Sequence, residues 1–288
     1  MSDVLTAARP RTLAARGLSL AYDGRIVVPE LELSIAAGRI TAIIGANGCG
    51  KSTVLRGLAR LLAPRAGIVE LDGADVRGIP GRHLAKLLGI LPQEPIAPDG
   101  ITVAELVMRG RHPHQGVFGR RDADDEAVVA EALRLTDTLG LAAARVGELS
   151  GGQRQRVWIA MALAQNPDVL LLDEPTTFLD IAHQLEVLDL LAELNDRLGT
   201  TVVMVLHDLN LAARYADELV VMADGRVHAS GIPSTVITES VLSTAFGLSA
   251  RVIADPETGS PLVVPRTRPR RTTRPPSAAE ADAERKEA

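Results

Sequence analysis

Four short segments of the chain are apolar throughout, apart from Thr41 in the first, instead of alternating with polar residues. A uniformly apolar run of this length is typical of a strand whose sheet is covered on both faces. The four segments are Ile40–Ile44, Val169–Leu172, Val202–Leu206 and Leu219–Met222. We expect them to be neighbouring strands of one buried sheet.

Amphipathic segments of helical length lie between these strands, at about Lys51–Leu61, Ile181–Leu198 and Asp208–Tyr215. In the second, apolar residues recur every three or four positions and should fall on one buried face. Those residues are Ile181, Leu185, Leu188, Leu191 and Leu194. The alternation of strands and helices predicts an α/β fold with a mainly parallel sheet.

Two regions interrupt this alternation. Leu13–Ile35 and Ile68–Val76 have the pattern of paired strands, which predicts a small antiparallel sheet beside the main one. Residues 93–166 have helical patterns and little strand signal, so we expect a helical insert. One of its helices, Asp124–Leu139, opens on acidic residues, which suit a helix N-terminus.

Composition places the chain among ordinary globular proteins. Its 288 residues are 46% hydrophobic and 23% charged, which excludes a long disordered chain. The longest apolar run, Val157–Ala164, is shorter than the roughly 20 residues that cross a membrane. The absence of a signal-peptide pattern at the start of the sequence and a single cysteine, Cys49, favour the cytosol.

Charge is distributed unevenly. Residues 266–288 carry seven basic and four acidic side chains, whereas the remainder carries 24 basic and 32 acidic ones. A body this acidic argues against broad binding of nucleic acid through its phosphates. The tail is rich in Pro, Arg, Ala and Glu and is predicted to be disordered, with anionic lipid or RNA as alternative partners for its arginines.

A glycine-rich loop follows the first apolar strand and precedes a helix. It fits the pattern G-x-x-x-x-G-K-[ST], whose backbone N–H groups surround phosphate oxygens at a helix N-terminus. The lysine of such a loop reaches the β- and γ-phosphates, and the hydroxyl can bind Mg²⁺. The loop consists of Gly45, Ala46, Asn47, Gly48, Cys49, Gly50, Lys51 and Ser52, and Thr53 follows it.

The strand Val169–Leu172 ends in two carboxylates, Asp173 and Glu174. Ligands of parallel sheets bind at the carboxyl ends of strands, so this pair should lie near the phosphates. Asp173 suits the shell of a Mg²⁺ ion, and Glu174 is suited to polarise an attacking water.

A second helix start has the sequence Leu149-Ser150-Gly151-Gly152-Gln153. Ser150 is a good N-cap, and the glycines allow close approach of a ligand to the backbone. The helix end is therefore a second anion site. Because a phosphate loop already serves the nucleotide of this chain, a second site makes sense if it serves a partner subunit.

With these three motifs in this order, the chain resembles the ATP-binding-cassette (ABC) ATPases from Thr12 to about Val264. The resemblance implies a P-loop NTPase cassette with a RecA-like core at about 12–92 and 167–265 and a helical subdomain at about 93–166. It also implies two chains clamped head to tail. Each ATP would lie between the phosphate loop of one chain and Ser150, Gly152 and Gln153 of the other.

Other positions match the family's motifs. Tyr22 resembles the aromatic that stacks on adenine, and Asp180 matches the loop that contacts the other subunit. Gln93 resembles the glutamine that touches Mg²⁺ and water, and His207 resembles the histidine at the γ-phosphate. The catalytic residues implied are Glu174, His207, Lys51 and Gln93, and the Mg²⁺ ligands are Ser52, Gln93 and Asp173.

Two positions depart from the family pattern. Many relatives have Ser where this chain has Cys49, and a thiol near a helix N-terminus is expected to have a depressed pKa. We therefore expect alkylation of Cys49 to inhibit the enzyme and ATP to protect it. Phe178 stands where a smaller residue is common, which predicts altered packing at the dimer seam without loss of activity.

Several segments narrow the resemblance to ATPases of bacterial iron-siderophore importers, of the ferric-enterobactin and ferric-dicitrate types. They are Arg109–Gln115, Leu149–Met161, Thr176–Gln184, Val205–Leu211 and Pro261–Pro265. The resemblance implies a peripheral subunit at the cytoplasmic face of the membrane, working with a separate permease and indirectly with a substrate-binding protein. His112 and His114 make a poor metal site, and in the family this segment faces the permease.

Three other functions remain open at this point. The chain could serve an importer of haem, cobalamin or another metal chelate, because those ATPases share much of the pattern. It could serve an exporter, although exporters often fuse cassette and membrane domain. A soluble ABC ATPase acting on DNA or ribosomes is less favoured, because such proteins carry a long coiled coil or two cassettes, and only about 100 residues separate the two anion-site motifs here.

Overall fold

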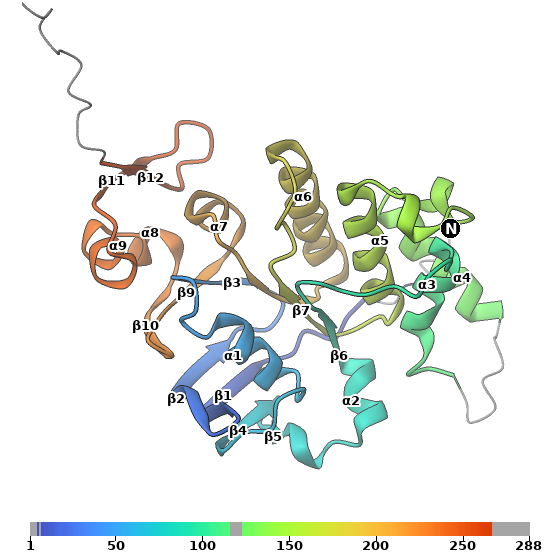
Figure 1. Cartoon of the computed structure of the whole chain (residues 1–288), viewed down its shortest axis with the longest axis horizontal. Coiled ribbons are helices and arrows are strands. Elements are labelled where there is room, and N and C mark those ends of the chain that lie inside the picture. The colour runs from blue at the N-terminus through green and yellow to red at the C-terminus, as the bar shows by residue number, and fades with distance from the viewer. Residues whose placement is uncertain (1–4, 6, 116–122, 267–288) are drawn as a thin grey trace, which may run out of the picture.

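The computed structural model describes residue 5, residues 7–115 and residues 123–266 (Figure 1). The tail that was expected to be disordered lies outside the described residues, apart from Arg266. The guanidinium of Arg266 pairs with Glu239 at 3.0 Å.

A six-stranded sheet in the order β10–β9–β3–β8–β7–β6 forms the centre of the molecule. Every neighbouring pair is parallel except β9 and β10. The four apolar segments all lie in this sheet, which confirms the prediction of a mainly parallel α/β core, and β6 and β10 are added to it. The strands are β3 (Ile40–Gly45), β6 (Leu88–Leu91), β7 (Val169–Asp173), β8 (Thr201–Val205), β9 (Glu218–Ala223) and β10 (Arg226–Gly231).

Successive residues of these strands enter two separate hydrophobic cores. In β3, Ala42 and Ile44 belong to one buried cluster and Ile43 to the other, and in β8 Met204 and Val203 divide in the same way. This division follows from the twofold repeat of a strand. Both faces of the sheet are covered, which explains why its inner strands β9, β3, β8 and β7 are almost entirely apolar, whereas the edge strand β10 is not.

The two smaller sheets are antiparallel. The predicted one is confirmed in the order β2–β1–β4–β5, and it packs with α1 against one face of the central sheet. The other is a hairpin near the end of the described chain. The strands are β1 (Leu13–Tyr22), β2 (Arg25–Ile35), β4 (Ala66–Leu71) and β5 (Ala74–Asp75), with β11 (Ala250–Ala254) and β12 (Pro261–Pro265) in the hairpin.

The expected helical insert lies between β6 and β7, where α3, α4 and α5 pack against one another on the right of Figure 1. The helices are α1 (Lys51–Leu58), α2 (Gly81–Leu87), α3 (Val103–Met108), α4 (Ala123–Leu135), α5 (Gly151–Ala164), α6 (Ile181–Leu198), α7 (Leu209–Tyr215), α8 (Pro233–Val236) and α9 (Glu239–Phe246). Short 3₁₀ turns cover Val76–Gly78, Arg109–Arg111, Leu139–Leu141 and Val146–Glu148.

Two predicted helices end earlier than expected. α1 ends at Leu58 and not Leu61, because Arg60 adopts a φ of 58°. α4 ends at Leu135 and not Leu139, because Asp137 has a φ of 52° and the hydroxyl of Thr136 turns back to a helix carbonyl. A left-handed residue cannot continue a right-handed helix.

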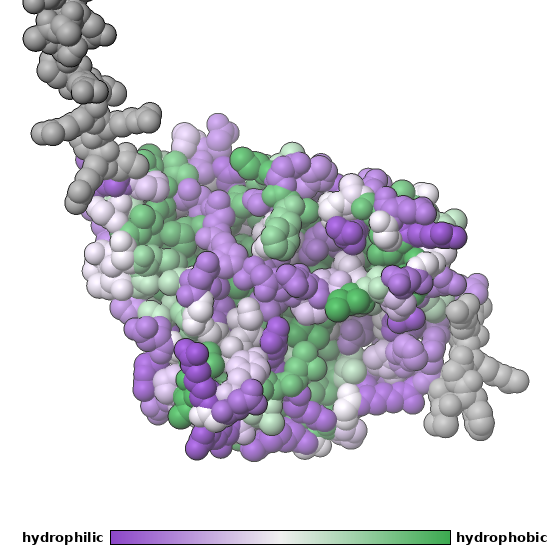
Figure 2. Space-filling model, viewed as in Figure 1, coloured by the Kyte–Doolittle hydropathy of each residue, from purple (hydrophilic) through white to green (hydrophobic). Residues whose placement is uncertain are grey.

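The predicted buried face of α6 is only partly confirmed. Leu188, Leu191 and Leu194 are buried, Leu185 is half-buried, and Ile181 is 76% exposed at the start of the helix. In the described ranges, no helix has the length and apolar character needed to span a membrane. Polar and apolar residues are interspersed over the face shown in Figure 2.

Candidate functional site

Four parallel strands end at the same edge of the central sheet. β3 leads into the loop at Gly45, and its neighbour β8 is followed by His207. β7, beside β8, ends in Asp173 and is followed by Glu174, and the outer strand β6 precedes Gln93. Strand order therefore gathers residues that are far apart in the sequence at one edge, where parallel sheets bind ligands.

The loop after β3 turns sharply into α1. A side chain at Gly45 would place its Cβ 2.4 Å from the carbonyl oxygen of Met222, so only glycine fits. Gly50, the N-cap of α1, has a φ of 102°, which favours glycine. No side chain caps α1, so its first N–H groups are available to an external acceptor.

A cavity of about 400 Å³ lies beside this helix start. Backbone N–H groups, the helix dipole and a lysine at one end of a cavity suit a phosphate group. Carboxylate, amide and imidazole side chains line the same cavity. The cavity is lined by Val27, Asn47, Gly48, Gly50, Lys51, Ser52, Thr53, Gln93, Glu174 and His207.

Lys51 is the basic group of this loop. It is only 5% exposed, and its Nζ donates to the carbonyl oxygens of Gly45 at 2.9 Å and Ala46 at 3.1 Å. The backbone carbonyl groups at the start of the loop therefore hold the ammonium inside it. An anion bound by the loop would lie beside this charge.

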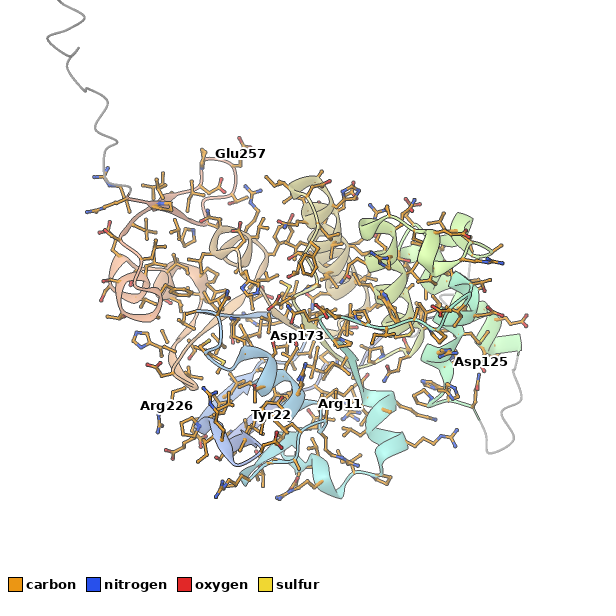
Figure 3. All side chains as sticks on the ribbon, viewed as in Figure 1. Arg11, Tyr22, Asp125, Asp173, Arg226 and Glu257 are labelled. Atoms are coloured by element: carbon orange, nitrogen blue, oxygen red, sulfur yellow. The ribbon has the colours of Figure 1, made fainter. Side chains whose placement is uncertain are left out.

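Ser52 and Asp173 are joined by a hydrogen bond of 2.8 Å from the hydroxyl to Oδ1. Burial raises the pKa of Asp173 above its ordinary value, and the charge of Glu174 raises it further, while the bond from Ser52 opposes the shift. The carboxylate lies near the middle of the molecule in Figure 3. A hydroxyl and a carboxylate oxygen side by side are the oxygen donors that Mg²⁺ prefers.

Glu174 is held by three side chains. Gln93 donates to Oε2 at 2.6 Å, Thr177 donates to Oε2 at 3.0 Å, and Nε2 of His207 lies 2.6 Å from Oε1. The backbone of Glu174 has a φ of 54°, a conformation that residues other than glycine rarely adopt and that concentrates at functional sites. Both oxygens of this carboxylate are thus fixed at the cavity, as a general base requires.

Other predicted site residues lie outside the cavity lining. Tyr22, at the end of β1, lies on the antiparallel sheet in Figure 3 and accepts a hydrogen bond from Arg56 at 3.3 Å. Ser150 and Gln153 form a capping box at the start of α5. Asp180 caps α6. The chain alone therefore assembles the phosphate-loop residues with Gln93, Asp173, Glu174 and His207, but not these others.

The predicted depression of the Cys49 pKa is wrong. The thiol is buried, and burial raises its pKa more strongly than the charge of Lys51 lowers it. The partial positive charge at the helix start lowers the pKa of a nearby thiol, but this effect is smaller than the increase caused by removing the thiol from water. The structure gives no support to a reactive thiol at this loop.

Two residues of the site were missed in the sequence. Val27 of β2 lines the cavity, and an apolar strand residue carries no signal for that role. Thr177 holds Glu174, and its position in the turn after the strand could have suggested the contact.

His114, in the predicted docking segment, points into the protein. Its Nε2 lies 2.8 Å from the carbonyl oxygen of Gln165, and burial lowers its pKa. Arg111 of the same segment is also buried and pairs with Asp125 at 2.8 Å. Within the described residues, no group of three or more His, Cys, Asp or Glu side chains is arranged to hold a metal.

Comparisons with known proteins show which family the chain belongs to. The ABC transporter family model matches residues 28–177. The probable siderophore transport system ATP-binding protein YusV of Bacillus subtilis (strain 168) is 50% identical over 258 residues, covering 90% of this chain and 94% of the relative. The ferric enterobactin transport ATP-binding protein FepC of Escherichia coli (strain K12) is 48% identical over 253 residues, covering 88% and 93%.

Solved structures show the same fold. cbiO1 of Clostridium perfringens, part of the ABC transporter complex cbiONQ, has a TM-score of 0.70 at 31% identity over 81% of this chain and 93% of that one. A dimeric, post-hydrolysis structure of the cassette MJ0796 bound to ADP and Pi has a TM-score of 0.67 at 28% identity, covering 76% and 98%. The chain therefore belongs to the ABC transporter family and is one of its ATP-hydrolysing cassettes.

Proposed function

We propose that this chain is the ATP-hydrolysing subunit of an importer that drives ferric siderophore uptake through a separate membrane permease. The observation that carries the proposal is the identity of 50% and 48%, over 90% and 88% of the chain, with relatives named for siderophore and ferric enterobactin transport. The cluster at the sheet edge supports the ATP chemistry independently of those names.

The start of α1 binds the phosphates in this proposal. N–H groups from Asn47 to Thr53 donate to phosphate oxygens, and Lys51 moves from its loop carbonyls to the β- and γ-phosphates. Tyr22 stacks on adenine from the antiparallel sheet. The 400 Å³ cavity beside the loop supports this placement of the phosphates.

The donor set also fits a magnesium ion. The bonded pair of Ser52 and Asp173 supplies two oxygens, and the amide oxygen of Gln93 can supply a third. Mg²⁺ commonly takes one or two protein ligands and completes its shell with phosphates and water. When bound, it would neutralise charge that develops on the β- and γ-phosphate oxygens.

Hydrolysis follows from the fixed carboxylate of Glu174. A water oxygen attacks the γ-phosphorus while the bond to the β–γ bridging oxygen breaks, and Glu174 accepts the water's proton. Gln93 and Thr177 keep the carboxylate in place. His207 and Lys51 stabilise the charge on the transferred phosphoryl group.

We further propose that two copies act head to tail beneath the permease, at the cytoplasmic face of the membrane. Ser150, Gly152, Gln153 and Asp180 lie outside the cavity of their own chain and would complete the site of the other. Phe178 is 86% exposed beside Asp180 and would pack at this seam. The dimeric MJ0796 cassette, which has the same fold, supports the arrangement.

Uptake of radiolabelled ferric enterobactin in iron-starved cells lacking the gene tests the importer. Wild type should restore uptake and Glu174→Gln should not. The matched control Glu193→Gln changes an exposed glutamate of α6 and should restore uptake. Restoration by Glu174→Gln, or by no variant for any ferric siderophore tried, would contradict the proposal.

Haem and cobalamin uptake in the same strains distinguish the alternatives. Loss of one of these activities with ferric siderophore uptake unaffected would assign the subunit to that importer instead. The ATPase activity would stand in either case, because it rests on the site and the family.

A further inference from the structure

His183 lies in the first turn of α6, where that helix packs against α5 (Figure 1). Oδ1 of Asp180 accepts two hydrogen bonds from it, one from its backbone N–H at 3.0 Å and one from Nδ1 at 2.8 Å. A carboxylate only accepts, so Nδ1 carries the proton. These bonds hold the pKa of Asp180 below its ordinary value.

The other side of the same ring closes against Gly152. A Cβ added at Gly152 would lie 2.5 Å from Cδ2 of His183 and 3.1 Å from its Cγ. At the preceding Gly151 the nearest atom would be 3.7 Å away, on Leu179. The ring therefore crowds position 152 and not position 151, so a side chain at position 152 would have to displace it.

A further contact continues this seam one turn along both helices, where Arg156 of α5 pairs with Glu186 of α6. The starts of the two helices are thus joined by the close approach of the His183 ring to Gly152 and by an ion pair. Of the side chains at this seam, His183 contacts both Asp180 and the backbone of Gly152.

We propose that His183 is a positioning residue that holds Asp180 and the start of α5 in one arrangement, so that both meet the nucleotide of a second copy together. The inference rests on the head-to-tail dimer of the proposed function. It assigns the role to the Nδ1–H group, which orients Asp180, and to the carbon side of the ring, which lies against Gly152.

Melting temperatures of the full chain test the contact. Gly152→Ala should lower the melting temperature by about 3 °C, because the added methyl overpacks the seam. In a His183→Ala background the same change should have little effect, because the ring is gone. Gly151→Ala is the matched control and should not lower it in either background. Equal losses from Gly152→Ala in both backgrounds would overturn the contact.

ATP turnover tests the positioning role. His183→Ala should lower kcat about 10-fold with KM for ATP nearly unchanged, because ATP binds first at the α1 side of each chain. His183→Asn places an amide N–H near the position of Nδ1 and should recover most of kcat, whereas His183→Gln should not. His83→Ala, an exposed histidine of α2, is the control.

Equal kcat for the Asn and Gln variants, or an unchanged kcat for His183→Ala, would overturn the role. Siderophore uptake plays no part in these measurements, so failure of the importer proposal leaves them intact. Sedimentation of the Glu174→Gln variant with ATP tests whether the chain forms the dimer on which this role depends. If the variant stays monomeric, both the dimer and the role of His183 are wrong. If it dimerises and the kinetic results above are obtained, the role is established.

Discussion

The starts of α1 and α5 are both glycine-containing turns into helices, but their N-caps differ. α1 has Gly50 as its N-cap and no side-chain cap, and a buried lysine and a cavity lie beside it. α5 has a closed capping box, in which Ser150 accepts from the backbone of Gln153 and Gln153 accepts from that of Ser150. The first start is open to a phosphate within one chain. The second is closed by its own cap and lies outside the cavity of its chain, although the hydroxyl of Ser150 accepts in this cap and can still donate to a ligand.

The proposed dimer uses this difference: the α1 start binds the phosphates of its own chain, and the α5 start completes the site of the other copy. Substitutions at the α1 start should therefore affect nucleotide binding and hydrolysis together. Substitutions at the α5 start should affect hydrolysis alone. The predictions below test that division in order of expected size.

Lys51→Ala should give the largest effect. Loss of the ammonium from the phosphate loop removes a positive charge that stabilises the negative charge developing on the transferred phosphoryl group, and we expect turnover to fall about 1,000-fold. ATP affinity, measured with a fluorescent analogue, should fall as well. Lys86→Ala in α2 is the control and should behave like wild type. A Lys51→Ala variant that retained a tenth of wild-type turnover would contradict the claim that the α1 start serves both nucleotide binding and hydrolysis.

Ser150→Ala should separate the two starts. Removing the cap should cost about 1 kcal/mol of stability, and turnover should fall about 10-fold while ATP affinity stays unchanged. Ser150→Thr keeps a hydroxyl and should retain most of both. If ATP affinity fell in parallel with turnover, the α5 start would belong to the same chain's binding site and the division would be wrong.

Asp173→Asn should abolish Mg²⁺-dependent turnover but raise the melting temperature at neutral pH. Burial raises the pKa of Asp173, so between its unfolded and folded values the folded chain binds more protons than the unfolded chain. Stability from this group is therefore lost as pH rises through that window. Asparagine removes the buried charge and keeps an acceptor for Ser52.

The stabilisation by Asp173→Asn should shrink as the pH is lowered toward the ordinary range of an aspartate. Thermal melts of both proteins across a pH series measure it. A gain that stays constant with pH, or a loss of stability at neutral pH, would contradict the raised pKa.

Cys49 should give the smallest effect. Because burial raises its pKa, iodoacetamide near neutral pH should modify it at least about 10-fold more slowly than free cysteine, with or without ATP. Cys49→Ser should leave turnover near wild type. Mass spectrometry of the treated chain measures the rate, and fast labelling that ATP prevents would restore the original expectation of a reactive thiol.

The sequence predicted the sheet edge well because its signals are local. The phosphate loop and the pair Asp173–Glu174 are contiguous motifs, and uniformly apolar strands identify a covered sheet. The helix ends were less accurate because Arg60 and Asp137 adopt left-handed backbone without being glycine. Such conformations depend on surrounding packing that no local pattern shows.

The missed features depend on contacts between distant segments. The hairpin β11–β12 buries little, and Asn210 of α7 holds it by accepting from the backbone of Val263 at 2.7 Å. His183 shows its significance only beside Gly152, which lies on another helix. Neither contact produces a periodic pattern or a motif of fixed spacing in the sequence.

Mixing two inactive variants tests the central claim most directly. Lys51→Ala disables the α1 start, and Ser150→Glu places a negative charge at the α5 start. In a head-to-tail dimer a mixed pair contains one intact site, so equal amounts should recover about one quarter of wild-type turnover. A mixture no more active than its separate components would contradict a site shared between two copies.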